Sequence, residues 1–152
     1  MKNVLFVFAF TIFGWLAVNA QNVQEPSKIK DKDVPEVVRN AFDNQFDNTA
    51  MAQWKMKEGN YKVSFRQGLK KHMAEFSSSG ELISKGEKVE KNDLPTPVGD
   101  AVKANYSNSN IDEVYRIEKN GETQYLVKLE GNPKKKVVYD VQGKVLTEKM
   151  EE

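Results

Sequence analysis

Two stretches of the chain, sixty residues apart, carry the same pattern of apolar residues and prolines. The pattern begins at Asp33 in the first stretch and at Asp93 in the second. It comprises Val34, Pro35, Val38, Ala41, Phe42 and Phe46 in the first, and Leu94, Pro95, Val98, Ala101, Val102 and Tyr106 in the second. Self-similarity at a fixed period indicates a repeated unit that buries its apolar face against its neighbour. A unit of this length alone buries only about 60% of its unfolded surface. We therefore expect two copies, residues 33–91 and 92–152, that share one core or one sheet.

Each copy begins with a helical period and then changes to alternation. Val34–Phe46 is expected to be a helix with Asp33 as its N-cap, and Glu36 completes a pattern like the capping box. Thr96–Tyr106 is the corresponding helix of the second copy, and both helices have their apolar residues on one stripe. Alternating runs separated by turn residues then predict three or four short strands in each copy. These runs are Trp54–Met56, Tyr61–Phe65, Ala74–Phe76 and Leu82–Ile83, then Ile111–Glu118, Tyr125–Leu129, Val137–Val141 and Val145–Leu146.

This order of elements predicts an α+β fold. Two helix-plus-strand units joined in tandem give an antiparallel sheet of about six to eight strands, because each strand has one clearly apolar side. Both helices are expected to pack on one face of that sheet. The opposite face would be open to water or to a partner. A polar run that ends at Lys91 is expected to link the two copies.

The first twenty residues are typical of a secretory signal peptide. Lys2 supplies the charged start, Val4–Val18 the apolar stretch, and Val18-Asn19-Ala20 a small-residue cleavage site. The apolar run is shorter than the roughly 20 residues of a membrane-spanning helix, so cleavage before Gln21 is favoured over an uncleaved anchor. Residues 21–32 are expected to be a flexible leader. No later stretch predicts a membrane span, so the mature chain is expected to be periplasmic or secreted.

The composition excludes two classes of protein. The chain has no cysteine, so no disulfide supports the fold, and stability must come from packing and backbone pairing. Of 23 basic and 22 acidic residues, only Lys2 lies in the signal, which leaves 22 of each in the mature chain. A nucleic-acid binder usually carries a strong basic excess. We therefore expect no nucleic-acid partner.

Few residues suit catalysis or metal binding. His72 is the one imidazole, too few for a zinc site built from several histidines and cysteines. The spacing Asn108-x-Asn110-x-Asp112 is that of a calcium loop, but Glu113 replaces its glycine and Lys119 its closing glutamate. We expect no catalytic residue, no metal and no cofactor. An enzyme that uses carboxylates alone is the least favoured alternative.

Two basic clusters are candidate binding residues. Lys70 and Lys71 in the first copy are equivalent to Lys134, Lys135 and Lys136 in the second, and each cluster follows a glycine-containing turn. If a pseudo-twofold axis relates the copies, the clusters would lie at equivalent edges of the sheet and attract an anionic partner. The alternative is that these lysines protect strand edges against aggregation.

Two aromatic residues are also candidates. Trp54 and Tyr115 lie in corresponding first strands with opposite parity, so both cannot face the core in the same register. One of them would then lie on the open face of the sheet, where a large aromatic suits a binding anchor. The competing account, which is favoured, is that both pack in the core and that a β-bulge corrects the register.

Several of these motifs resemble one family. They are the Asp-Leu-Pro start at Asp93, the Tyr-x-Val-x-Leu strand at Tyr125–Leu129, and the aromatic-Asp-x-x-Gly-Lys-hydrophobic ending at Tyr139–Val145. With them the chain resembles the PepSY-like family, also called β-lactamase-inhibitor-like, over residues 33–150. In the first copy, Phe76–Leu82 keeps the aromatic, the glycine and the apolar residue of the ending but replaces its Asp and Lys. The resemblance implies tandem helix-plus-sheet repeats in an envelope or secreted bacterial protein.

These observations predict a non-enzymatic exported binding module. It would recognise an envelope or secreted protein, or a small ligand, through the open sheet face or the hairpin loops. The alternative, which the family label implies, is an inhibitor or regulator of an exported hydrolase.

Overall fold

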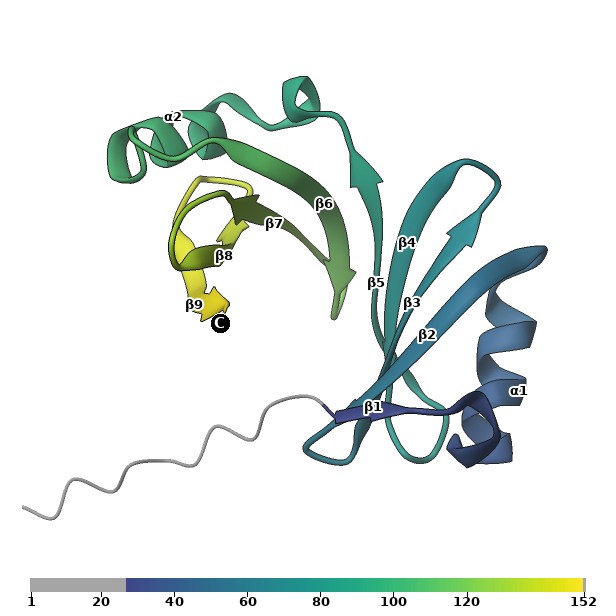
Figure 1. The fold of residues 1–152 in the computed structure, drawn as a ribbon. Coiled ribbons are helices and arrows are strands. Elements are labelled where there is room, and N and C mark those ends of the chain that lie inside the picture. The colour runs from purple at the N-terminus through teal and green to yellow at the C-terminus, as the bar shows by residue number, and fades with distance from the viewer. Residues whose placement is uncertain (1–26, 152) are drawn as a thin grey trace, which may run out of the picture.

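A computed structural model of the chain describes residues 27–151, which form one sheet and two helices (Figure 1). The strands are β1 (Ser27–Ile29), β2 (Thr49–Lys57), β3 (Asn60–Gln67), β4 (Lys70–Phe76), β5 (Leu82–Val89), β6 (Ile111–Lys119), β7 (Glu122–Leu129), β8 (Lys134–Asp140) and β9 (Val145–Glu151). The helices are α1 (Glu36–Gln45) and α2 (Thr96–Asn105), preceded by 3-10 turns at Asp31–Asp33 and Lys91–Asp93. The expected signal peptide, residues 1–20, and the first part of the leader lie outside the described residues.

The nine strands pair in chain order, and every neighbouring pair is antiparallel. The predicted α+β class is confirmed, and each copy supplies four strands after its helix. The described sheet has nine strands instead of the expected six to eight, and the expected leader and linker also need correction. Part of the supposed leader is β1, because Ile29 pairs with Trp54 and packs against the first core. The supposed linker before Lys91 is strand as far as Val89, because β5 pairs with β6 and continues the sheet between the copies.

Helix α1 begins later than expected, whereas α2 begins at Thr96 as predicted. Asp33 is not the N-cap of α1; it ends a 3-10 turn, and Pro35 occupies the N-cap position. A residue before proline is driven toward extended backbone, and Val34 accordingly has a ψ of 132°. Leu94 before Pro95 has the same ψ in the second copy. The helix in each copy therefore starts after its proline.

Both helices lie on the same face of the sheet, as expected. Residues paired across antiparallel strands point to one side, and Val63, Ala74, Lys85 and Glu118 form such a row from β3 to β6. Val114 is four residues from Glu118 and so points to that side as well. Val63 and Val114 belong to the cores under α1 and α2, respectively. Because β2 and β6 run in the same direction, the copies are related by displacement along the sheet, not by a twofold axis.

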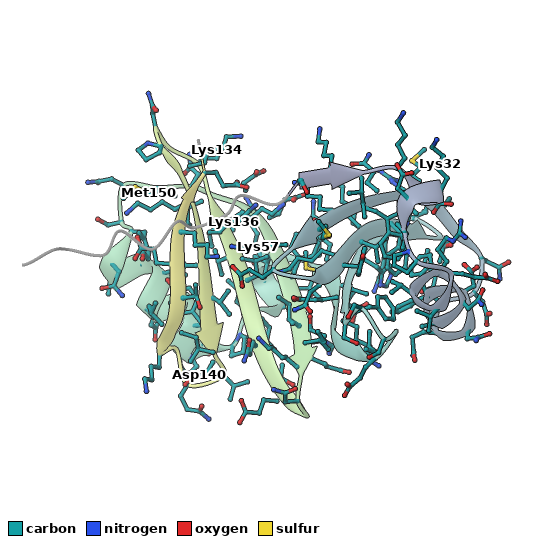
Figure 2. The ribbon with its side chains drawn as sticks, turned by 90° about the horizontal axis from the view of Figure 1, so that it is seen from below. Lys32, Lys57, Lys134, Lys136, Asp140 and Met150 are labelled. Carbon is teal, nitrogen blue, oxygen red and sulfur yellow. The ribbon has the colours of Figure 1, made fainter. Side chains whose placement is uncertain are left out.

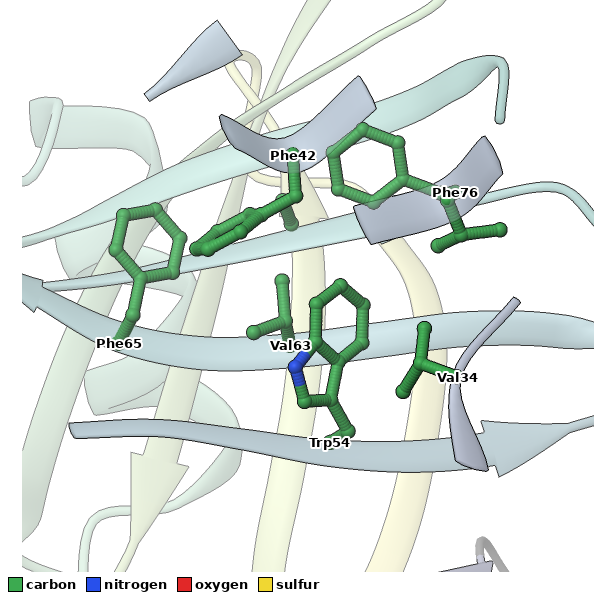
Figure 3. Packing of buried hydrophobic residues seen from close by; sticks show 8 residues of the cluster. Val34, Phe42, Trp54, Val63, Phe65 and Phe76 are labelled. Carbon is green, nitrogen blue, oxygen red and sulfur yellow. The ribbon is translucent and has the colours of Figure 1, made fainter. Parts of the chain in front are cut away.

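The two copies share the sheet but not a core. Under α1, the Phe42 ring lies edge-on to Trp54 and Phe65, with ring centroids 5.3 and 5.0 Å apart (Figure 3). That first core is Val34, Val38, Phe42, Trp54, Val63, Phe65, Ala74 and Phe76. The second, under α2, is Val98, Val102, Val114, Tyr125, Val127, Leu129, Val137 and Tyr139. Of the two expected arrangements, the shared sheet is therefore the observed one.

Equivalent glycines bring the turns after β4 and β8 against the helices. Gly80 and Gly143 have φ values of +84° and +82°, in the left-handed region. A Cβ on Gly80 would lie 2.9 Å from the Val37 carbonyl oxygen, and one on Gly143 would lie 2.4 Å from that of Pro97. Real Cβ atoms do not approach so closely, so only glycine fits either turn.

A side-chain oxygen supports each of these turns. Asp140 Oδ1 accepts hydrogen bonds from the amides of Gln142 and Lys144, both at 2.9 Å. In the first copy Ser77 Oγ accepts from the amides of Ser79 and Glu81, at 3.3 and 3.1 Å. The serine thus makes the two bonds of the aspartate that it replaces, because both side chains present an acceptor to the same turn. The first copy keeps the turn although it departs from the family's ending.

Candidate binding face

The face of the sheet without helices is concave. Gly86 lies in β5, and a Cβ there would be 3.2 Å from Met73 Cγ and 3.1 Å from Ile117 Cγ1, on the strands to either side. A glycine within a strand permits such a bend. The curvature continues until Lys149 on β9 lies beside Lys57 on β2. In Figure 1 the sheet curls with α1 and α2 on its outside, and we call the inner side the concave face.

The concave face concentrates positive charge. By strand register, twelve basic and five acidic side chains point to it. The basic residues are Lys28, Lys55, Lys57, Lys62, Arg66, Lys71, Lys88, Lys119, Lys128, Lys134, Lys136 and Lys149, and the acidic ones are Glu75, Glu113, Glu122, Asp140 and Glu151. The expected mature chain carries 22 of each, so its other residues include ten basic and seventeen acidic. The balanced composition therefore conceals a basic face on a chain that is otherwise acidic.

Glu113 is the centre of the ion pairs on the concave face. Its carboxylate accepts hydrogen bonds from Lys71, Lys88 and Lys128 at 2.7, 3.1 and 2.8 Å, and from the Tyr115 hydroxyl at 3.0 Å. Burial opposes ionisation of this carboxyl, but the three lysines outweigh burial and hold its pKa well below the usual range. Lys71 and Lys88 come from the first copy and Lys128 from the second. One carboxylate therefore ties the two halves together.

An apolar row lies beside Glu113. Tyr115, Leu126 and Val138 pair across β6, β7 and β8, and the last two side chains are half-buried. Lys128 Nζ lies 5.1 Å from the centroid of the Tyr115 ring, a cation–π arrangement. Burial, together with the negative charge of Glu113, raises the pKa of Tyr115. The floor of the concave face is thus apolar, and lysines surround it.

Trp54 and Tyr115 point to opposite faces, as their parity indicates, but neither is exposed. Trp54 lies in the first core at 3% exposure, and its Nε1 donates to Asp31 Oδ1 at 3.1 Å. Tyr115 is on the helix-free face at 4% exposure, under the lysine side chains. The expectation of an exposed aromatic anchor is wrong, because the curl of the sheet and the hydrogen bond to Glu113 bury the residue that faces inward.

The two lysine clusters do not lie at sheet edges. β4 and β8 each have a strand on both sides, so their lysines cannot protect an edge. Successive side chains of a strand point to opposite faces of the sheet, so each cluster is divided between the two faces. Lys70 and Lys135 point to the helix side, where they pair with Glu87 at 3.5 Å and Glu148 at 2.9 Å. Lys71, Lys134 and Lys136 point to the concave face. The expected clusters thus contribute three of their five lysines to that face.

The described residues contain no group of side chains arranged to hold a metal ion. Within residues 27–151, no three His, Cys, Asp or Glu side chains gather to hold a metal. His72 stacks on Phe65 with ring centroids 5.5 Å apart, and burial lowers its pKa. A hollow of about 520 Å³ beside α1 is lined by small and amide side chains with one acid, Glu36.

Sequence reasoning missed the residues that shape the concave face. In the sequence analysis Glu113 is only the residue that replaces the glycine of a calcium loop, and Lys57 and Lys149 carry no prediction. A signal was present, since Lys55 and Lys62 lie next to the core residues Trp54 and Val63 along β2 and β3. Reading the polar side of each strand, in register with its neighbours, would have found the basic face.

Two overlapping segments of the chain, residues 14–84 and 59–147, match the model of one protein family, described as "putative beta-lactamase-inhibitor-like, PepSY-like". Together the matches extend over most of the chain. The chain belongs to the PepSY-like family. The resemblance carried by the sequence motifs is thereby confirmed. No curated protein matches this PepSY-like chain.

Solved structures from Bacteroides share the fold. A protein of Bacteroides eggerthii described as "putative periplasmic" has a TM-score of 0.65 and 16% identity, over 77% of this chain and 88% of that one. A DUF2874 family protein of Bacteroides ovatus has a TM-score of 0.61 and 20% identity, over 76% and 86%. A BLIP-like protein of Bacteroides fragilis has a TM-score of 0.56 and 21% identity, over 76% and 85%. At such identities the likeness establishes the fold alone.

Neither helix of the PepSY-like chain between residues 27 and 151 is long and apolar enough to cross a bilayer. The first structural neighbour given above is described as a putative periplasmic protein.

Proposed function

We propose that this PepSY-like chain is a non-enzymatic exported binding module that recognises its partner through the concave face of the sheet. One observation carries the proposal. Both helices cover the convex side, and the uncovered side holds twelve basic against five acidic side chains over an apolar floor. An apolar centre within a charged rim is typical of recognition surfaces. The partner is expected to be acidic. Because a signal peptide is expected, binding is expected to take place in the periplasm or outside the cell.

The test compares capture of partners by matched charge variants. The mature chain from Gln21 is immobilised and exposed to envelope and secreted extracts. Lys28 and Lys55 face each other on the concave face and are exposed, so their double change to Glu leaves the cores intact. Lys91 and Lys103 are exposed near α2, and their change to Glu alters the net charge equally.

A saturable partner retained by K91E/K103E and lost by K28E/K55E is the expected result. Opposite charges steer association, so the loss is expected in the association rate and to shrink at high salt. Equal capture by both variants would place recognition outside the concave face, at the hairpin loops or elsewhere.

The family description favours a second candidate, inhibition of an exported hydrolase. One structural neighbour is described as BLIP-like. As an inhibitor, the chain would bind the rim of an enzyme's active site with its concave face. Purified β-lactamases assayed with increasing amounts of the mature chain provide the test. Unchanged hydrolysis at micromolar chain would remove those enzymes as targets and leave the binding proposal in place.

A further inference from the structure

Two rows of lysines cross the concave face. In the first half, Lys28, Lys55 and Lys62 pair with one another across β1, β2 and β3. In the second half, Lys128, Lys136 and Lys149 pair across β7, β8 and β9. Neighbouring strands are only about 4.8 Å apart, so each row holds three like charges side by side. Like charges directly opposite one another destabilise a sheet. The rows therefore oppose folding unless negative charge neutralises them.

The carboxylates of the concave face do not neutralise both rows. Glu113 is already shared by three lysines, of which only Lys128 belongs to a row. Lys62 pairs with Glu75 at 3.2 Å, and Lys136 pairs with Glu151. Among residues 27–151, no carboxylate lies within 4.0 Å of the amines of Lys28, Lys55 or Lys149. The described part of the protein thus leaves an excess of positive charge.

The second row meets the first half of the sheet at Lys57. The ammonium of Lys149 lies beside that of Lys57, and Lys62 is close by. Figure 2 shows Lys57 and Lys136 on facing halves of the curled sheet. The Lys57 side chain is only 11% exposed, and its one acidic neighbour, Glu58, is 3.6 Å away and largely in solvent. The Lys57 amine, then burial, then Lys62 lower the pKa of Lys149. Two amines this close, one of them on a side chain that is only 11% exposed, repel each other unless one loses its proton or an anion neutralises both.

We propose that a small multivalent anion binds at this seam, held by Lys57, Lys62, Lys136 and Lys149. Carboxylate or phosphate groups would accept charge-assisted hydrogen bonds from amines on both halves of the sheet. A small molecule suits the seam better than a folded partner, since a protein surface cannot reach an amine as enclosed as that of Lys57. The inference rests on the proposed function, because it assigns a ligand class to the concave face. The bound anion would also join β2 to β9.

The test measures binding of citrate and of tripolyphosphate to the mature chain by calorimetry, at constant ionic strength set with sodium chloride. The variants are Lys57→Met and Lys149→Met, which keep most of the side-chain length without the charge. Lys103→Met on the exposed side of α2 is the matched control. We expect saturable binding of at least one anion, weakened about tenfold or more by either seam variant and unchanged by K103M. The tighter of the two anions indicates whether the seam accommodates phosphate or carboxylate groups better.

A second readout separates the site from general stabilisation by salt. The Lys149 amine, followed by NMR in lysine-labelled protein, should shift its pKa upward when the anion binds, because the anion favours the charged form. The melting temperature of ligand-free K149M should be equal to or above that of the natural chain, since the change removes a like-charge contact. A folded K149M that binds no anion would then support the site.

Three outcomes would overturn the inference. The first is no binding of either anion to the natural chain. The second is equal binding by seam and control variants, which would indicate diffuse attraction. The third is tighter binding of an oligoglutamate peptide than of either small anion, which would assign the face to acidic polypeptides. None of these outcomes removes the proposed function, which the K28E/K55E capture experiment tests with protein partners. If that capture experiment fails while anion binding is intact, only the protein partner is removed.

Discussion

At the scale of single residues, Tyr139 carries an unusual cost. It is fully buried in the second core, and its hydroxyl has no hydrogen-bond partner within the described part of the chain. Phe76 holds the equivalent position in the first core without a hydroxyl. A buried hydroxyl without a partner is destabilising by about 1–3 kcal/mol. The tyrosine is therefore a defect that phenylalanine would correct.

Tyr139→Phe is expected to raise the free energy of unfolding by about 1 kcal/mol. Burial, with a smaller contribution from Glu148, raises the pKa of Tyr139 to about 12. Its folded pKa lies above the unfolded value of 10.0, so the free energy of unfolding falls as pH rises from there toward 12. Y139F should flatten that alkaline loss. Urea unfolding at pH 7 and above pH 10 measures both effects, and Tyr125→Phe, at 9% exposure in the same core, is the control. Destabilisation by Y139F at pH 7 would show that the hydroxyl has a partner.

At the scale of elements, the turns after β4 and β8 decide how the helices sit on the sheet. Each combines a side-chain acceptor, Ser77 or Asp140, with a glycine pressed against a helix backbone. The first turn of α2 and the β8–β9 turn are thus a single packed unit. The ending motif that carries the family resemblance is explained by this contact and not by any chemistry.

Gly143→Ala is expected to destabilise the protein by about 2–4 kcal/mol, the sum of left-handed backbone strain and overlap with the Pro97 carbonyl. Gly121 in the β6–β7 hairpin is the matched control, since its φ is +79° but a Cβ there would meet nothing within 4 Å. Gly121→Ala should therefore cost only the strain, about 1–2 kcal/mol. Chemical unfolding of both variants gives the comparison. Equal losses would mean that the turn moves away from α2 without cost.

At the scale of the whole molecule, the two copies have separate cores but belong to one sheet. They are joined because β5 pairs with β6 and because Glu113 binds lysines from both copies. The pairing supplies the backbone connection. Glu113 supplies the only described carboxylate within ion-pair distance of Lys71, Lys88 and Lys128. Removal of the Glu113 carboxylate is therefore expected to destabilise both halves.

Glu113→Gln is expected to lower the free energy of unfolding by about 1–3 kcal/mol, since three lysines lose their partner. Glu118→Gln, which breaks the exposed pair with Lys85, should cost about 0–1 kcal/mol. The folded pKa of Glu113 lies below its ordinary value of 4.5, so the stability it contributes is present above that pH and lost as pH falls below it. E113Q should therefore lose less stability in acid than the natural chain. Trp54 fluorescence and circular dichroism during urea unfolding report the midpoint. A loss no larger than that of E118Q would show that Glu113 does not join the halves.

Local patterns were enough to predict the repeat, both helices and eight of the strands from the sequence. Apolar spacing and turn residues act within a few neighbours, and residues such as Val38 and Val98 show the same spacing in both copies. The start of α1 was predicted too early, because Pro35 drives Val34 into extended backbone and so prevents a cap at Asp33, whereas α2 begins at Thr96 as predicted. β1 was missed because three residues carry too little pattern to predict a strand.

The sequence by itself determined that this chain is a duplicated, cysteine-free, helix-plus-sheet protein, because helical and strand periods are local properties of its residues. Only the tertiary structure decided that there are two cores, that the free face is concave, and that Lys57 meets Lys149. Those features depend on register and curvature accumulated over nine strands. Lys57 and Lys149, almost a hundred positions apart in the chain, come near each other only because each strand between them adds to the curvature of the sheet.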